Sequence, residues 1–150
     1  MDEESGFTLI EVVCVLAIVG LLAMLVLPAI PRATSQGRLA GYAVQVAALL
    51  KGDRNAAIRN HSAVTTTLDA DRHTIRSGAS DDVVEIPADV SFEALLAQRC
   101  SGRRAGSTID FFPSGASCGG AIAVSRNGVG YEIRVNWLTG GVEIVAIGKA

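Results

Sequence analysis

Glu11 is the residue whose type and position most strongly suggest a chemical role. It stands directly before a run from Val12 to Ile30 that contains no charged residue. A carboxylate beside an apolar segment costs free energy unless it is paired, and such residues are usually functional. The run is long enough for a helix across the hydrocarbon core of a bilayer, which takes about 20 apolar residues. Gly20 and Pro28 interrupt the run, but both are tolerated in membrane helices.

A cut after Gly6 would supply a partner for this carboxylate. It would leave the apolar run on the mature chain and create a new amino group at Phe7, one helical turn from Glu11. A secretory signal peptide instead has a basic start, a shorter apolar core and a cleavage site beyond that core. An ordinary signal anchor is the alternative interpretation of the run.

The stretch Gly-Phe-Thr-Leu-Ile-Glu at residues 6–11, with its trailing apolar run, resembles the leader junction of type IV pilins and type II secretion pseudopilins. The resemblance implies cleavage between Gly6 and Phe7 by a prepilin peptidase on the cytoplasmic side. It also implies N-methylation of Phe7, use of Glu11 to recruit and align subunits, and a helix kink at Pro28.

The overall composition limits the number of domains and the classes of binding partner. The 150 residues allow one compact domain beyond the apolar segment. The formal net charge is −2, and removal of the acidic residues at 2–4 with the leader would bring it to about +1. Pilin leaders usually carry Lys or Arg there, so the acidic leader departs from the family. Neither charge indicates a strongly basic nucleic-acid-binding protein or an acidic tail.

Helical periodicity continues after the apolar run and then gives way to β patterns. Apolar residues recur every three or four positions on one predicted helix face: Leu39, Tyr42, Ala43, Val46, Leu50 and Ala57. These patterns predict an α+β fold with a long N-terminal helix packed on a C-terminal antiparallel β domain. The resemblance implies that this fold is type IV pilin-like. Its parts are a leader at 1–6, a transmembrane and filament-core helix at 7–30, a helix extension at 31–60 and a β-rich domain at 61–150.

Strand patterns are clearest near the C-terminus. Strands are expected at 64–68, 73–76, 83–86, 108–112, 121–125, 131–137 and 142–147, while 90–97 is ambiguous and 99–107 is expected to be a loop. Asn127-Gly128 predicts a hairpin turn. Alternation in 131–137 places Tyr131, Ile133, Val135 and Trp137 on one core-facing side.

The three cysteines fall in two settings. Cys14 lies in the apolar run, where it is expected to act as a small hydrophobic residue. Cys100 and Cys118 lie in the part expected to face an oxidising periplasm, so a disulfide between them is a candidate, although the sequence does not show that they meet.

No pattern typical of an active site is present. His61 and His73 lack metal-ligand spacing, and no glycine-rich phosphate loop or nucleophile elbow occurs. The C-terminal region also lacks the acidic loop that calcium ligation needs. We therefore expect no enzymatic activity, no cofactor and no metal site.

Two further parts of the sequence indicate which group of pilins the chain resembles. Residues 53–60, and residues 109–115 together with 138–142, resemble the type II secretion minor pseudopilin H (GspH) family and the related FimT and FimU minor type IV pilins. The resemblance implies a minor pseudopilin that supports export of folded proteins across the outer membrane. Its implied partners are other pseudopilins, prepilin peptidase/N-methyltransferase, the inner-membrane assembly platform and membrane lipid. The implied location is the inner membrane, crossed once, with the N-terminus cytoplasmic before processing and the C-terminal domain periplasmic.

The alternative is a minor type IV pilin, similar to FimT and FimU, that acts in pilus assembly or DNA uptake. Its support in the sequence is the cluster of Arg99, Arg103 and Arg104, since such clusters can contact phosphates. A solvated loop explains the same cluster without nucleic acid.

Overall fold

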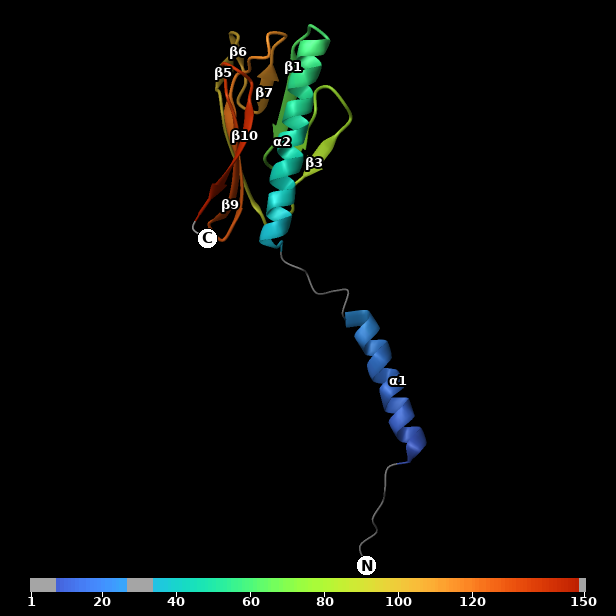
Figure 1. Cartoon of the computed structure of the whole chain (residues 1–150). Helices are drawn as coiled ribbons and strands as arrows, with labels where there is room; N and C mark the ends of the chain where they lie inside the picture. The colour runs from blue at the N-terminus through green and yellow to red at the C-terminus, as the bar shows by residue number, and fades with distance from the viewer. Residues whose placement is uncertain (1–7, 27–33, 149–150) are drawn as a thin grey trace, which may run out of the picture. The chain divides into compact units, whose positions relative to one another are not determined.

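Two helices, α1 (Leu9–Val26) and α2 (Gln36–Arg59), occupy the N-terminal part of the chain. The computed structural model describes residues 8–26 and 34–148, and the chain separates into the units Met1–Ala33 and Thr34–Ala150 (Figure 1). Within the described ranges, no helix is both long enough and apolar enough to span a membrane. The predicted segment at 7–30 extends past both ends of α1 into residues outside those ranges.

The prediction of one long helix is wrong at the start of α2. Ser35 has an extended backbone, with φ −78° and ψ 161°, and its hydroxyl accepts a hydrogen bond from the Arg38 N–H at 3.4 Å. This is N-cap geometry, in which a side-chain oxygen satisfies one of the free N–H groups of a new helix. The sequence therefore starts a second helix at Gln36 instead of continuing the first.

The second unit contains two four-stranded antiparallel sheets. The first sheet has the order β3-β2-β1-β7, from β1 (Val64–Asp69), β2 (Thr74–Arg76), β3 (Val83–Glu85) and β7 (Thr108–Phe111). The second has the order β10-β9-β8-β4, from β4 (Ser91–Leu96), β8 (Gly120–Arg126), β9 (Val129–Val135) and β10 (Val142–Ile147). The predicted α+β class, with a helix packed on antiparallel sheets, is confirmed.

The local strand predictions had different outcomes. The β8–β9 hairpin turns at Asn127 and Gly128, whose positive φ values of 53° and 78° are those that a tight hairpin turn requires. The ambiguous segment is strand β4, paired with β8. The predicted loop at 99–107 instead contains a short hairpin of β5 (Arg99–Cys100) and β6 (Arg103–Arg104).

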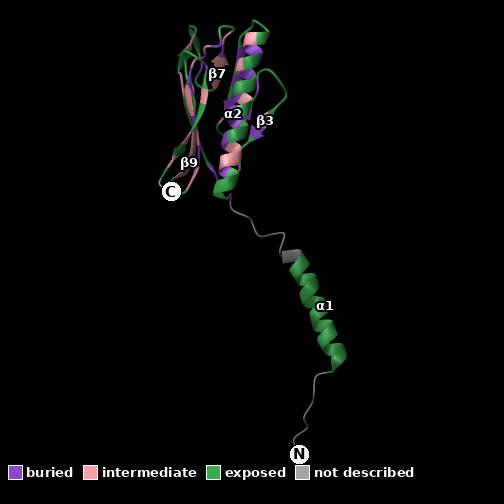
Figure 2. Cartoon of the chain, viewed as in Figure 1, coloured by how far each residue is buried: buried purple, intermediate pink, exposed green. Residues whose placement is uncertain are grey.

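The core of this unit lies between α2 and the two sheets. The predicted apolar face of α2 is buried, with Leu50 and Val46 fully inaccessible to solvent (Figure 2). Large side chains from both sheets complete the core, including Ile109 and Phe111 from β7, Ile122 from β8 and Ile133 from β9. Burial of these apolar surfaces is the main favourable term in the stability of the fold.

Trp137 does not join this core, so its predicted placement is wrong. It is 67% exposed, because β9 ends at Val135 and the chain then turns. The Asn136 N–H donates to the Gly141 carbonyl at 2.9 Å, and the Gly140 N–H donates to the Asn136 carbonyl at 2.8 Å. The side-to-side alternation of a strand does not continue through such a turn.

Candidate functional site

Glu11 lies in the first turn of α1. Its backbone N–H donates to the Thr8 carbonyl at 3.0 Å, and a carboxylate at this end of a helix is favoured by the helix dipole. Among the described residues, no salt bridge involves Glu11. The predicted cleavage and methylation residues, Gly6 and Phe7, and the predicted kink at Pro28 lie outside the described residues.

The rest of α1 is an exposed apolar helix. Leu9 is 84% exposed, Leu16 and Leu21 are each 65% exposed, and the part of the helix that Figure 2 colours by burial is marked as exposed. A helix that is apolar on all sides is normally covered by lipid or by other protein. α1 thus combines an apolar surface with one carboxylate at its N-terminal end.

Asp53 is a second carboxylate on a helix, and it is 1% exposed. Its oxygens accept hydrogen bonds from the Thr66 and Ser77 hydroxyls at 2.5 Å each and from the backbone N–H groups of Gly78 and Ala79 at 3.1 and 3.3 Å. A buried charge is tolerated when it is fully hydrogen-bonded in this way. These bonds tie α2 to β1 and to the loop after β2.

A groove of about 530 Å³ runs beside Asp53, between α2 and the segment that leads into β3. A groove with an acidic residue is the usual first candidate for an active site. Here both carboxylate oxygens already accept hydrogen bonds from the protein. Asp53 therefore acts as a structural anchor and not as a free acid or base in the groove.

Arg54 connects α2 to two C-terminal turns. Its Nε donates to the carbonyl oxygens of Gly115 and Thr139, at 3.1 and 3.0 Å. Gly140 lies in the same contact with φ +61°, and a Cβ atom there would collide with the Gly115 carbonyl. The glycine-rich turns of the sequence therefore allow close backbone packing around one arginine.

Thr34, the first residue of the second unit, is held by a cluster of polar contacts. The Thr34 N–H and hydroxyl donate to the Asp89 carboxylate at 2.8 and 3.0 Å, and the Arg126 guanidinium lies 3.6 Å from that carboxylate. These hydrogen bonds, with a smaller contribution from the Arg126 charge, lower the pKa of Asp89 below its ordinary value. Arg126 also donates to the Thr34 carbonyl at 3.1 Å.

The three predicted phosphate-contacting arginines come together on the β5–β6 hairpin. Arg99 lies directly opposite Arg104, and Cys100 lies opposite Arg103. All three arginines are exposed, and among the described residues none forms a salt bridge. Like charges placed opposite each other in a sheet are destabilising. A groove of about 430 Å³ lies beside Arg99 and Arg104.

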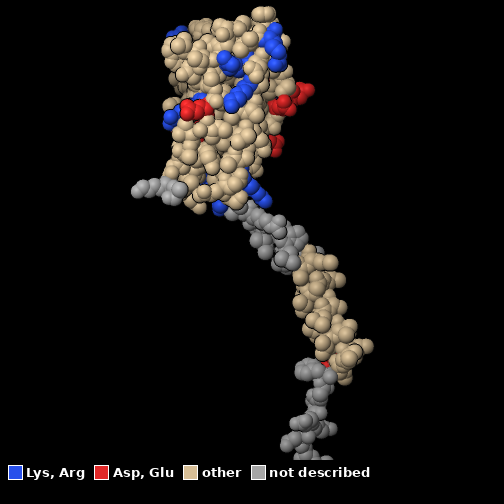
Figure 3. Space-filling view, viewed as in Figure 1, with Lys and Arg blue, Asp and Glu red and all other residues tan. Residues whose placement is uncertain are grey.

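The surface around these elements carries charge of both signs. On the face drawn in Figure 3, basic side chains gather in the upper part of the domain, but others lie beside an acidic group at its left edge and at its lower end. The exposed Arg134 and the half-buried Glu132 form a pair at 2.9 Å, in which the hydrogen bond from Arg134 lowers the pKa of Glu132. The exposed acidic and basic groups are thus interspersed rather than separated into one strongly basic face.

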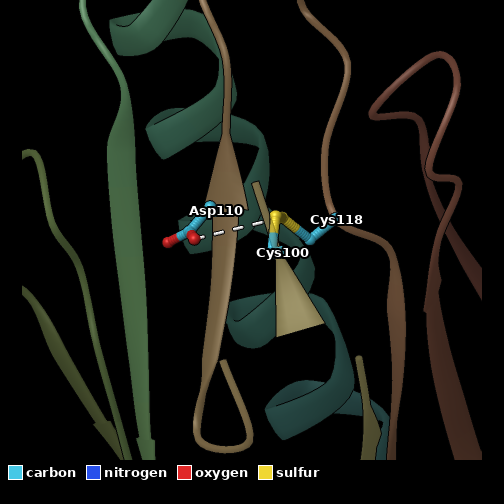
Figure 4. A group of neighbouring side chains, drawn as sticks. All are labelled: Cys100, Asp110 and Cys118. Atoms are coloured by element: carbon cyan, nitrogen blue, oxygen red, sulfur yellow. Dashed lines mark hydrogen bonds between the residues drawn. A yellow bond between two sulfur atoms is a disulfide. The ribbon is translucent and has the colours of Figure 1, made fainter. Parts of the chain in front are cut away.

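Cys100 and Cys118 are joined by a disulfide in the structure, with their Cα atoms 5.8 Å apart. The bond ties the β5–β6 hairpin to the turn before β8. Asp110 of β7 lies beside it, with its Oδ2 3.9 Å from the Cys118 Sγ (Figure 4). Cys14 is a free cysteine on exposed α1.

Sequence reasoning missed Asp53, Arg54, Asp89 and Asp110 as organising residues. For Asp53 a signal was present, because it falls on the same helix face as Leu50 and Ala57, where a charge is unexpected. Asp89 and Asp110 carried no such signal, since their partners come from distant segments.

Comparison with known proteins gives two kinds of match. Residues 1–27 match the family model described as the prokaryotic N-terminal methylation motif. No curated protein matches the sequence.

The structural matches are to pilin-type subunits. The type IV minor pilin FimU of Pseudomonas aeruginosa is 16% identical, with a TM-score of 0.55, over 73% of this chain and 89% of that chain. The minor pseudopilin EpsH from the type 2 secretion system of Vibrio cholerae is 10% identical, with a TM-score of 0.56, over 75% of this chain and 98% of that chain. The chain thus combines a prokaryotic N-terminal methylation motif with the fold of the minor pilins and pseudopilins.

Proposed function

We propose that this protein is a minor pseudopilin of a type II secretion system. It would be cut between Gly6 and Phe7, methylated at Phe7 and built into a pseudopilus that supports export of folded proteins across the outer membrane. Its partners would be the processing peptidase, the other pseudopilins, the inner-membrane assembly platform and lipid. Residues 7–30 would lie in the inner membrane before assembly, and the unit from Thr34 onward would be periplasmic.

The observation that carries the proposal is the exposed α1 helix with Glu11 in its first turn. The methylation motif covers the same region. Glu11 would pair with the new amino group of a neighbouring subunit, which removes the cost of leaving the carboxylate unpaired in an apolar setting. The apolar side chains would face lipid before assembly and other subunits afterwards.

The test replaces Glu11 in the full-length chain and follows assembly and secretion. Glu11→Leu is expected to reduce co-isolation with the other pseudopilins and to reduce secretion, while the domain stays folded. Glu143→Leu, an exposed carboxylate on β10, is the matched control and should leave both unchanged. Normal co-isolation and secretion in Glu11→Leu would refute the proposed role.

A second candidate function is that of a minor type IV pilin acting in pilus assembly or DNA uptake. It is favoured by the placement of Arg99, Arg103 and Arg104 on one hairpin, where each could contact a phosphate. Under this candidate, the full-length protein would retard DNA at low salt. The double variant Arg103→Ala/Arg104→Ala would weaken that binding and flatten its salt dependence. No retardation at low salt would eliminate the candidate.

A further inference from the structure

The outer face of the second sheet carries a shallow trough along β8. Ala121 and Ala123 lie on this face, because the residue between them, Ile122, is fully buried in the core. In the register of the sheet, Ala123 lies between Glu93 of β4 and Glu132 of β9. Small side chains on β8 are thus flanked by longer ones, which leaves two adjoining hollows of about 350 and 370 Å³ that share Ala121 and Glu132.

Two large apolar side chains lie uncovered at the rim of this trough. Leu95 is 80% exposed and lines one hollow, and Trp137 is 67% exposed and lines the other. Each lies near the glycine pair at 119–120, so both belong to the same end of the trough. Single exposed apolar residues are common on proteins, but exposed apolar residues grouped beside a hollow are typical of a protein-binding surface.

The walls of the trough carry more negative than positive charge. Glu132 is bonded to Arg134 at 2.9 Å, whereas Glu93 forms no salt bridge among the described residues. A guanidinium group pairs with carboxylates and also stacks on the face of an indole ring. A surface that offers both carboxylates and the exposed Trp137 therefore favours a partner that presents arginine.

The β5–β6 hairpin of the same chain presents arginine in a suitable form. Its turn is formed by Ser101 and Gly102, whose positive φ values of 48° and 80° are those of a tight hairpin. Cys100 is tied to the domain by its disulfide, so Arg99 and Arg104 lie on the other face of the hairpin. These two like charges are directly opposite each other, and a bound carboxylate relieves their repulsion. A hairpin held by a disulfide also loses little conformational freedom on binding.

We propose that the trough binds the β5–β6 hairpin of a second copy of this chain. Arg99 and Arg104 of one copy pair with the carboxylates in the trough of the other, and one guanidinium stacks on Trp137. Among the described residues these arginines form no salt bridge within their own chain, so they are available to a partner. The hairpin and the trough are different surfaces, so the contact joins the copies head to tail.

The contact is weak in dilute solution and is strengthened when copies are held close together. A hairpin of residues 99–104 covers less than the roughly 1,200–2,000 Å² that a stable protein complex buries. Copies anchored side by side reach an effective concentration of roughly millimolar. The inference goes beyond the proposed function, since Glu11 acts on α1, whereas this contact lies wholly within the second unit. Failure of one therefore leaves the other standing.

The experiment measures self-association of the full-length protein in detergent by sedimentation equilibrium at low salt, after nuclease treatment to remove nucleic acid. Glu93→Lys/Ala123→Lys makes the trough basic, and Arg99→Glu/Arg104→Glu makes the hairpin acidic. Each double variant alone should self-associate about tenfold more weakly than the unchanged chain, because its two surfaces then repel each other. An equimolar mixture of the two variants should regain association, because each surface again meets its opposite. Glu85→Lys, at an exposed carboxylate on β3, is the control and should change nothing.

Photo-crosslinking then locates the contact. A benzophenone amino acid in place of Leu95 should join two copies, with the adduct on the hairpin peptide of residues 99–104. The same group in place of Thr67, an exposed residue of β1, should not form this adduct. Trp137→Ala changes no charge and should reduce the yield of the adduct by about threefold or more.

Three results would overturn the proposal. The first is a chain that does not self-associate at low salt, and the second is association that neither double variant weakens, as contact through α1 alone would give. The third is an adduct of Leu95 that maps to a peptide other than the hairpin. All four substituted positions of the double variants face solvent at least in part, so their denaturant midpoints should match that of the unchanged chain. If one of these variants misfolds, the crosslink and Trp137→Ala still decide the question.

Discussion

The two helices of this chain make opposite use of apolar residues. α2 has one buried face and one polar face, and its buried face completes the core of the second unit. α1 is apolar on every side, and its described side chains are exposed. Each helix also carries a carboxylate, but Asp53 has four donors while Glu11 has no salt-bridge partner among the described residues. The comparison shows that α2 contributes to the core of the second unit, and under the proposed function the apolar surface of α1 would contact lipid or other subunits.

Matched leucines test this division with the largest expected effect. Leu50 of α2 is fully buried, so Leu50→Ala should lower the free energy of unfolding by about 3 kcal/mol. Leu16 of α1 is 65% exposed, so Leu16→Ala should leave the unfolding of the domain unchanged. Urea unfolding of the full-length protein in detergent, followed by circular dichroism, measures both. Equal losses in the two variants would contradict the division.

The two carboxylates provide the next test. Asp53→Asn removes the charge and one acceptor position, leaving at least one buried donor unsatisfied, at a cost of about 2 kcal/mol. Glu11→Gln should change the stability of the domain by less than about 0.5 kcal/mol. Denaturant midpoints compare the two variants. A stable Asp53→Asn protein would show that the hydrogen bonds around Asp53 are not an anchor.

A smaller effect is expected for the arginine of α2 that holds the C-terminal turns. Arg54→Met keeps much of the side-chain length but removes the donor to Gly115 and Thr139, so stability should fall by about 1 kcal/mol. Hydrogen exchange should accelerate first at the Gly115 and Gly140 amides. Arg38→Met, an exposed arginine of the same helix, serves as the control and should change neither quantity.

The smallest effect concerns pH. The pKa of Asp89 is lowered because Thr34 donates two hydrogen bonds to its carboxylate, so the fold favours the ionised form. This contribution is complete above the ordinary aspartate pKa of about 3.9 and is lost as pH falls through the lower folded-state value. A titration followed by nuclear magnetic resonance should show the Thr34 amide shifting in that acidic range. Asp89→Asn should abolish the shift.

Much of the fold was predictable because its signals are local. The apolar spacing from Leu39 to Ala57 predicted the packed helix, and Asn127-Gly128 predicted the hairpin turn. The errors arose where a non-local contact or a cap decides the structure. Ser35 starts a new helix, and Trp137 leaves the core when β9 ends.

The candidate site was predictable only in part, for the same reason. Glu11 could be identified from the sequence because it is a charged residue next to a long apolar run. The interaction of Asp53 with Ser77, and the position of Asp110 beside Cys118, depend on chain segments that meet only after folding. The spacing of residues in the sequence does not predict such contacts.

The central claim is that α1 becomes an assembly element through processing of the chain. Mass spectrometry of the protein purified from membranes of cells that contain a prepilin peptidase tests it most directly. We predict a mature chain that lacks residues 1–6, begins at Phe7 and carries one methyl group on the Phe7 amine. A full-length, unmethylated N-terminus, or cleavage beyond the apolar run, would contradict the claim.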